Sequence, residues 1–355
     1  MNGFYNDFSD VIIETPEERQ NKLKKQRRLF SRVFLALFVY ILSSYLVAYG
    51  SYAIAAAILS AEKYQSFAES SIWSVIISCV SQYFVAFPIF LLMLLGTPKA
   101  QNKERKKLSL GEFIIFFFMG QALMSAGNII GNFINSIFGG LMGRMPENGI
   151  AATIEQTPMW LIFIFMVILA PIVEELIFRK LLIDRLSVYG DRMAIIFSAA
   201  AFGLMHGNLY QFFYAALLGA LLGYVYTVTR DVRYTILMHM IINLFGSVIA
   251  LPVQEYMLEF FEILTAMQYG VPINVFKLLI CVSVMIVYSS LQYGMIIGGV
   301  IALVHYARKK KIVISSDKDI FLPDREIAKQ GVINVGAILF ILISLFLMVL
   351  NLFTA

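Results

Sequence analysis

Long apolar runs separated by short polar connections are the most regular feature of this sequence. A helix needs roughly 20 consecutive apolar residues to cross the hydrocarbon core of a bilayer. Runs of this kind predict about nine spans, although the fifth is short and "SSLQYGM" could interrupt the eighth. The predicted spans are 33–59, 71–96, 112–139, 159–184, 193–208, 210–229, 232–251, 276–306 and 334–354. We therefore expect an all-α polytopic transmembrane helical bundle of about eight to nine spans.

The composition supports a membrane protein and disfavours other classes. Hydrophobic residues make up 59% of the 355 residues and charged residues only 14%, whereas soluble domains are about half apolar and a quarter charged. The net charge of +5 is concentrated between apolar runs, which indicates orientation in a bilayer rather than nucleic-acid binding. Cys79 and Cys281 both lie in apolar runs, so they form neither a disulfide framework nor a CxxC metal site.

Basic residues occur in every second connection, which predicts the orientation. They cluster at 22–32, 99–107, 185–192, 230–233 and 308–311. We expect a multi-pass protein of the cell membrane with a cytoplasmic N-terminus, because Lys and Arg are enriched in cytoplasmic loops. The predicted regions are a cytoplasmic polar tail (1–32), N-terminal transmembrane helices (33–140), a core region (159–251) and C-terminal transmembrane helices (252–355) with a cytoplasmic polar loop at 307–333. Residues 251–275 predict either an amphipathic helix at the outer surface or an ordinary packed helix.

The fourth apolar run contains charged residues that are costly at membrane depth. Glu175 and Arg179 are four residues apart, so they lie on one helix face and can form an ion pair that lowers the cost of inserting each. Glu174 has no partner within its own segment. An ionisable residue of this kind inside a span indicates a functional site.

Two of the three histidines lie inside predicted spans, the fifth and the seventh. His206 falls in "AFGLMHG", and His239 falls in "ILMHMIIN", where Asn243 shares its helix face. One buried histidine is more often a packed core residue than a catalyst, but these groups all need polar partners in one low-dielectric space. At 1.5 Å per residue, all lie about 12–20 Å from the same side of the membrane. We therefore predict that Glu174, His206 and His239 converge inside the bundle, with polar atoms roughly 3–6 Å apart.

This set of side chains suits hydrolysis of an amide. Glu174 can act as general base on a water molecule, and His239 and Asn243 can donate hydrogen bonds to the developing oxyanion. His206 can orient the water or bind a metal ion. A zinc ion held by His206, His239 and a glutamate is chemically reasonable, although the sequence has no HExxH motif. A metal-free water activated by glutamate fits the same residues, and the sequence leaves both open.

Three motifs resemble those of the CAAX protease and bacteriocin-processing (CPBP, or ABI) family, which includes the type II CAAX prenyl endopeptidases. They are Glu174-Glu175-x-x-x-Arg179, Phe202-x-x-x-His206 and His239-x-x-x-Asn243, in this order within about 159–250. The resemblance implies an intramembrane endopeptidase with Glu174 as base, Glu175 and His206 assisting, His239 and Asn243 at the oxyanion, and Arg179 in a structural or substrate-orienting role. Lys180 departs from the family pattern, in which glycine often follows the arginine.

The implied partners are the lipid bilayer and a peptide or membrane-associated protein substrate, with no nucleic acid. Prenylated CaaX peptides, double-glycine bacteriocin leaders and peptide pheromones are the open substrate classes. Two other functions compete with proteolysis. One is a non-catalytic membrane scaffold or immunity protein with the same fold, and the other is an ion-coupled transporter whose buried acids and histidines relay protons. The transporter is disfavoured because the sequence shows no inverted repeat and no paired broken helices.

Overall fold

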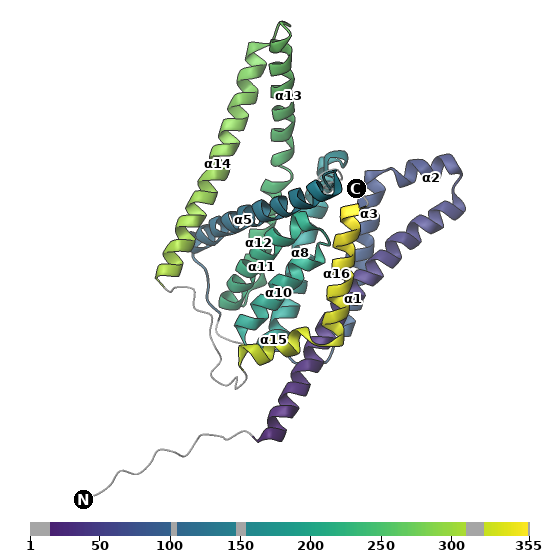
Figure 1. Cartoon of the computed structure of the whole chain (residues 1–355), viewed down its shortest axis with the longest axis vertical. Helices are drawn as coiled ribbons and strands as arrows, with labels where there is room; N and C mark the ends of the chain where they lie inside the picture. Colours follow the sequence, from purple (N-terminus) through teal and green to yellow (C-terminus); the bar gives the residue numbers. More distant parts are fainter. Residues whose placement is uncertain (1–14, 101–104, 147–153, 310–322, 354–355) are drawn as a thin grey trace, which may run out of the picture.

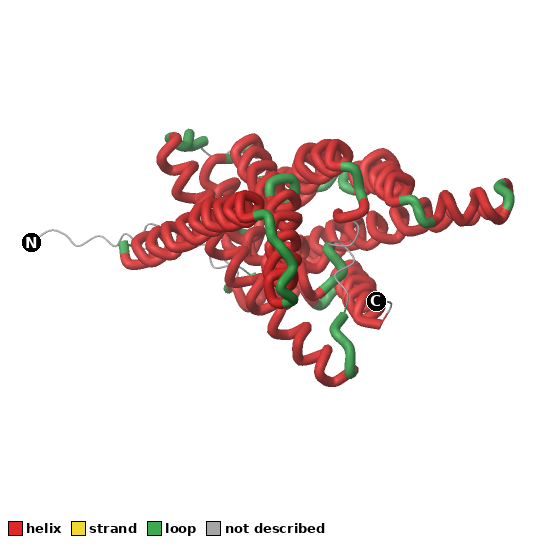
Figure 2. Tube along the Cα trace, turned by 90° about the horizontal axis from the view of Figure 1, so that it is seen from above, coloured by secondary structure: helices red, strands yellow, loops and turns green. Residues whose placement is uncertain are grey.

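The computed structural model describes residues 15–100, 105–146, 154–309 and 323–353, and these residues form helices and connecting loops without any strand (Figures 1 and 2). Eight of the helical segments described are long and apolar enough to cross a membrane. This result confirms the predicted all-α, multi-pass helical bundle. The nine-span interpretation fails at 193–208, where helix α10 (Asp191–Met205) has 15 residues. Such a helix is about 22 Å long, which is less than the roughly 30 Å of a hydrocarbon core.

The first helix begins well before the predicted span. Helix α1 (Pro16–Ile58) starts with a capping box, in which Thr15 and Glu18 satisfy each other's backbone N–H groups, and Pro16 occupies the first turn. Leu29 and Phe30 are buried in the core of the bundle. The expected polar tail at 1–32 is therefore helical from Pro16 onward and partly packed, and residues 1–14 lie outside the described part of the chain.

Two transmembrane segments contain a π-helical stretch that ends two residues before a proline. Proline lacks the N–H that an α-helix requires, and its ring clashes with the carbonyl four residues earlier, so widening of the preceding turn relieves the clash. The first segment contains Pro88 and consists of α3 (Ser71–Cys79), η1 (Val80–Ala86) and α4 (Phe87–Met93). The second contains Pro171 and consists of α7 (Met159–Ile162), η2 (Phe163–Leu169), α8 (Ala170–Glu175), η3 (Leu176–Ile183), α9 (Asp184–Leu186) and η4 (Ser187–Tyr189).

The centre of the bundle is formed by the second of these segments together with α5 (Leu110–Met142), α10, α11 (Leu209–Thr229) and α12 (Val232–Gly246). Small residues allow the closest approaches, as expected between membrane helices. A Cβ atom on Gly219 of α11 would lie 3.2 Å from the Cα of Ala199 on α10. The same atom on Gly127 of α5 would lie only 2.3 Å from the Cα of Tyr214 on α11. These glycines therefore fix the distances between α11 and its two neighbours.

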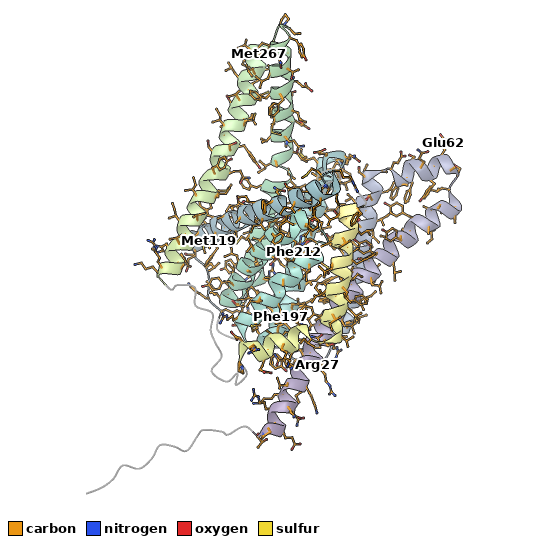
Figure 3. All side chains as sticks on the ribbon, in the orientation of Figure 1. Arg27, Glu62, Met119, Phe197, Phe212 and Met267 are labelled. Carbon is orange, nitrogen blue, oxygen red and sulfur yellow. The ribbon has the colours of Figure 1, made fainter. Side chains whose placement is uncertain are left out.

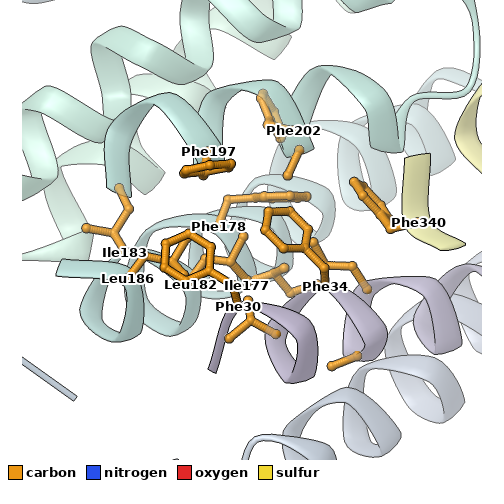
Figure 4. Packing of buried hydrophobic residues seen from close by; sticks show 14 of the residues in the cluster. Phe30, Phe34, Ile177, Phe178, Leu182, Ile183, Leu186, Phe197, Phe202 and Phe340 are labelled. Atoms are coloured by element: carbon orange, nitrogen blue, oxygen red, sulfur yellow. The ribbon is translucent and has the colours of Figure 1, made fainter. Parts of the chain in front are cut away.

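A large hydrophobic cluster joins this centre to the two ends of the chain (Figure 4). Phe30 of α1 packs edge to face on Phe197 of α10, with ring centroids 5.0 Å apart. Phe34 contacts Phe340 of α16 (Val335–Phe353), with centroids 5.9 Å apart. The last helix therefore lies along α1, and the short α15 (Asp324–Val332) precedes it.

Two helical hairpins extend from the bundle. In one, α2 (Ala61–Ala68) connects α1 to α3. In the other, α13 (Ala250–Gln268) packs against α14 (Val275–Arg308), and Glu259 pairs with Lys277 at 2.9 Å. Residues 251–275 therefore do not form a separate helix lying on the bundle surface, because α13 continues beyond α12 and pairs with α14. The α14 helix is unbroken, so "SSLQYGM" does not interrupt the eighth predicted span.

Basic residues from several connections meet at one end of the molecule. Arg32 donates to the carbonyl of Met93 at 2.7 Å, and Arg185 donates to the hydroxyl of Thr97 at 2.6 Å. Arg192 and Arg230 form ion pairs with Asp324 and Asp191, respectively, so α10, α11 and α15 share this end. Arg27 lies toward the same end and Glu62 lies at the opposite one (Figure 3). Residues 310–322 of the polar loop at 307–333 fall outside the residues described, and the end of the loop forms α15.

Candidate active site

A buried ion pair between Glu175 and Arg179 forms the centre of the candidate site. Arg179 Nε and Nη2 donate to the two carboxylate oxygens of Glu175 at 3.0 and 3.3 Å, and both side chains are fully buried. Arg179 also donates to Ser198 Oγ at 3.1 Å, and Ser198 in turn donates to the carbonyl of Phe178 at 2.8 Å. The predicted pair is thus confirmed, and it is anchored to both α10 and its own helix. A bidentate pair of this kind holds both charges in a defined geometry.

His239 of α12 links this pair to the neighbouring carboxylate. Its Nδ1 lies 3.1 Å from Glu175 Oε1, and its Nε2 lies 3.8 Å from Glu174 Oε2. A carboxylate accepts hydrogen bonds, so Nδ1 carries the proton in the first contact. The second contact is too long for a direct hydrogen bond, and it is a separation that a water molecule can bridge.

Glu174 and Glu175 are adjacent in sequence but lie in different environments. The Glu175 side chain is completely buried against a cation, whereas the Glu174 side chain is 29% exposed. Two carboxylates held in such different surroundings are typical of a site in which one is structural and the other reacts.

His206 approaches the site from the end of α10. The sequence places it within a predicted span, but in the structure it caps the helix after Met205, and Gly207 follows with a positive φ of 63°. His206 Nδ1 donates to the carbonyl of Phe202 at 2.8 Å, which leaves Nε2 as the free ring nitrogen. Phe202 packs edge to face on both His206 and His239, with centroids 5.0 and 5.8 Å apart.

The structure therefore confirms only part of the predicted convergence of Glu174, His206 and His239. Glu174 and His239 fall within the expected 3–6 Å, and His206 reaches the same region through Phe202. No contact recorded among the described residues joins His206 directly to Glu174. Lys180, which departs from the family pattern, pairs with Asp184 at 2.9 Å and takes no part in the buried centre.

Asn243 makes a contact that the sequence did not predict. Its amide nitrogen Nδ2 donates to the backbone carbonyl of Met166 at 2.8 Å. In this π-helical turn each carbonyl is bonded by the N–H five residues later, as Ala170 bonds to Phe165, and for Met166 that residue is Pro171. Proline has no N–H, so Asn243 satisfies a carbonyl that the kink leaves without a helical partner.

Several residues of the site were missed by sequence reasoning. Phe202 stacks under the guanidinium of Arg179, with Cζ 4.9 Å from the ring centroid, in a cation–π contact. Ser198 lies four residues before Phe202 and eight before His206, so the three share one face of α10, and this spacing could have revealed it.

The residues present do not form an evident metal site. In the part of the chain that the structure describes, no group of three His, Cys, Asp or Glu side chains is arranged to hold a metal ion. The ring Nδ1 atoms of His206 and His239 are both engaged in hydrogen bonds, which leaves Nε2 of each ring as the nitrogen that a metal ion would bind. The zinc ion held by His206, His239 and a glutamate stays a prediction, and the proposed mechanism includes no step through a metal.

The fold and site together define a polytopic membrane protein with a buried carboxylate, arginine and histidine centre. Residues 156–245 match the family model described as "Type II CAAX prenyl endopeptidase Rce1-like". The chain is also 30% identical over 192 residues to the protein called "Putative membrane peptidase YdiL" of Bacillus subtilis (strain 168), covering 52% of this chain and 75% of that protein. No solved structure matches the chain. The chain belongs to the CPBP family, which includes the type II CAAX prenyl endopeptidases.

Proposed function

We propose that this protein is an intramembrane endopeptidase in which Glu174 activates a water molecule to hydrolyse a peptide bond. The difference between the two adjacent carboxylates carries the proposal. Glu175 is bound by Arg179 and His239, so its negative charge is already compensated. Glu174 is partly exposed and is separated from His239 Nε2 by a gap suited to water.

The roles of the surrounding residues follow from their contacts. Glu175 accepts from Nδ1 of His239 and so fixes which ring nitrogen faces Glu174. Arg179 keeps Glu175 charged and ties it to α10 through Ser198. Glu174 then takes a proton from the water as the water oxygen adds to the scissile carbonyl, and later returns that proton to the leaving amine.

The substrate is a peptide or a membrane-associated protein, because the site lies among helices that are apolar enough to cross a bilayer. The basic residues meet at one end of the molecule, and this end is proposed to face the cytoplasm of a cell membrane. In that orientation the N-terminus is cytoplasmic.

The test uses purified protein in liposomes and three internally quenched peptides: a farnesylated CaaX peptide, its unprenylated counterpart and a double-glycine leader. Wild-type protein is expected to cleave at least one of them, and Glu174→Gln is expected to lose roughly 10²–10⁴-fold in rate. Glu259→Gln, which alters a carboxylate on the α13–α14 hairpin, is the matched control and should cleave normally.

Each alternative predicts a different result. A non-catalytic scaffold or an ion-coupled transporter gives no cleavage by the wild-type protein, and a Glu174→Gln rate close to wild type removes Glu174 as the base. A parallel series with a metal chelator tests the cofactor. An unchanged rate supports water activated by glutamate alone, and a lost rate that zinc restores shows that a metal takes part.

A further inference from the structure

A small cavity at the basic end of the molecule is lined mainly by positively charged side chains. Its volume is about 290 Å³, and it lies between η3, the segment before α5 and the connection from α11 to α12. The lining residues are Arg105, Lys180, Arg230, Asp231, Val232 and Arg233. None of them belongs to the buried centre of the candidate active site, and Lys180 is the residue that departs from the family pattern.

The carboxylates around this cavity do not balance its positive charge. The ion pairs are Arg233 with Asp231 at 2.6 Å, Arg230 with Asp191 at 2.6 Å and Lys180 with Asp184 at 2.9 Å. Asp184 also accepts a hydrogen bond from the hydroxyl of Tyr226 at 2.6 Å. Arg105 forms no ion pair within the described part of the chain. Four cations therefore meet three carboxylates, and the guanidinium of Arg105 is left to bind an anion.

Arg230 forms the most buried part of the cavity wall. Its side chain is 9% exposed, and its Nη2 donates to Asp191. Arg230 ends α11 in the left-handed conformation, with a φ of 50°, at a position where glycine is the usual residue. Its Nε is buried and has no hydrogen-bond partner among the described residues. A buried donor without an acceptor is costly, and an oxygen atom of an anion in the cavity can accept from it.

Exposed apolar side chains continue from the cavity toward the middle of the membrane. Leu237 follows Arg233 by one turn on the same face of α12 and is 50% exposed. Leu110 opens α5, five residues after Arg105, and is 76% exposed. A soluble anion leaves such a surface uncovered, whereas a phospholipid places its phosphate at the cations and its acyl chains on the apolar side chains. This combination therefore favours a lipid ligand.

We propose that this cavity binds the phosphate group of an anionic phospholipid. Guanidinium groups suit a phosphate because their N–H donors match its oxygen atoms in pairs, and Lys180 adds a further positive charge. Basic pockets between transmembrane helices on the cytoplasmic side bind anionic headgroups, and this end of the molecule is the one proposed to face the cytoplasm. The site does not depend on peptide hydrolysis, so it can be tested independently of the proposed function.

The test measures ligand binding to the delipidated, full-length protein in a neutral detergent. Phosphatidylglycerol, phosphatidylcholine and inorganic phosphate are added separately, and the bound molecules are counted by native mass spectrometry. Wild-type protein should bind one phosphatidylglycerol more tightly than any phosphatidylcholine, because the second lipid carries the same phosphate beside a cationic choline. Arg105→Gln combined with Lys180→Gln should weaken the binding of phosphatidylglycerol about 25-fold, or about fivefold for each cation removed.

A second double variant is matched in charge. Lys106→Gln combined with Arg192→Gln removes two cations that pair with Glu112 and Asp324 and do not line the cavity. It should bind phosphatidylglycerol as tightly as the wild-type protein does. Thermal unfolding without lipid checks that both double variants are folded. Arg105→Gln alone breaks no ion pair with a described residue, so it should keep the fold and still lose about fivefold in affinity.

Three results would overturn the proposal. The first is an equal loss of affinity in the two double variants, which shows that only the net charge of the protein matters. The second is equal binding of phosphatidylglycerol and phosphatidylcholine by the wild-type protein. The third is binding of inorganic phosphate as tight as that of phosphatidylglycerol, which assigns the cavity to a soluble anion instead of a lipid.

Discussion

The hydrogen bond from Asn243 to the carbonyl of Met166, beside the proline kink, allows a quantitative prediction of the free energy of unfolding. Replacing Asn243 by leucine keeps the side-chain volume close but leaves the carbonyl of Met166 without a donor. An unsatisfied buried acceptor costs about 1–3 kcal/mol, whereas hydrogen bonds between membrane helices average about 0.6 kcal/mol and reach about 1.7. We therefore expect Asn243→Leu to lower the free energy of unfolding by about 1–2 kcal/mol.

Changing Pro171 should remove much of this cost. Pro171→Ala restores a backbone N–H five residues after Met166, in position to bond to the same carbonyl. Asn243→Leu should then cost less in the Pro171→Ala background, with a coupling of about 1 kcal/mol between the two substitutions. The free energy can be measured by unfolding the purified protein with SDS in mixed micelles, for all four proteins of the cycle.

Asn135→Leu combined with Pro171→Ala is the control for this coupling. Asn135 is also buried and donates to a carbonyl, that of Gly131, but both lie on α5. Asn135→Leu and Pro171→Ala should be additive within about 0.5 kcal/mol. If Asn243→Leu and Pro171→Ala are equally additive, the carbonyl of Met166 does not depend on Asn243 and the argument for its structural role is wrong.

Two further predictions concern packing and topology. Gly127→Ala should separate α5 from α11 and cost about 1–3 kcal/mol, together with most of the cleavage activity, because the new Cβ overlaps the backbone of Tyr214. Gly140→Ala, with no atom within 4 Å of the new Cβ, is its control on the same helix, and equal effects of the two would contradict the packing argument. The topology test starts from a protein in which Cys79 and Cys281 are replaced by alanine. Single cysteines introduced at positions 27 and 62 should then react with an impermeant thiol reagent from opposite sides of the membrane (Figure 3). The cysteine at position 27 should react from the cytoplasmic side. Labelling of both from one side would refute the proposed topology.

Much of the architecture was available from the sequence because the bilayer imposes it. An apolar segment inside a membrane must satisfy its own backbone hydrogen bonds, so it forms a helix, and its length can be read from the sequence. The ion pair of Glu175 with Arg179 was equally accessible, since a spacing of four residues places both on one face of any helix. The short fifth span and the early start of α1 were less accessible, because local caps rather than hydropathy decide where a helix begins and ends.

The composition of the site beyond its charged residues depended on tertiary structure. The sequence indicated that Glu174, His239 and Asn243 needed polar partners, but it could not say which partner each would find. Asn243 binds a carbonyl left open by a proline 72 residues away in sequence, and Phe202 of α10 packs against both Arg179 and His239. Such contacts join helices whose relative rotation is fixed by glycine-mediated packing. Hydropathy records the depth of a residue in the bilayer and carries no information on this rotation, so only the folded bundle decided which side chains meet.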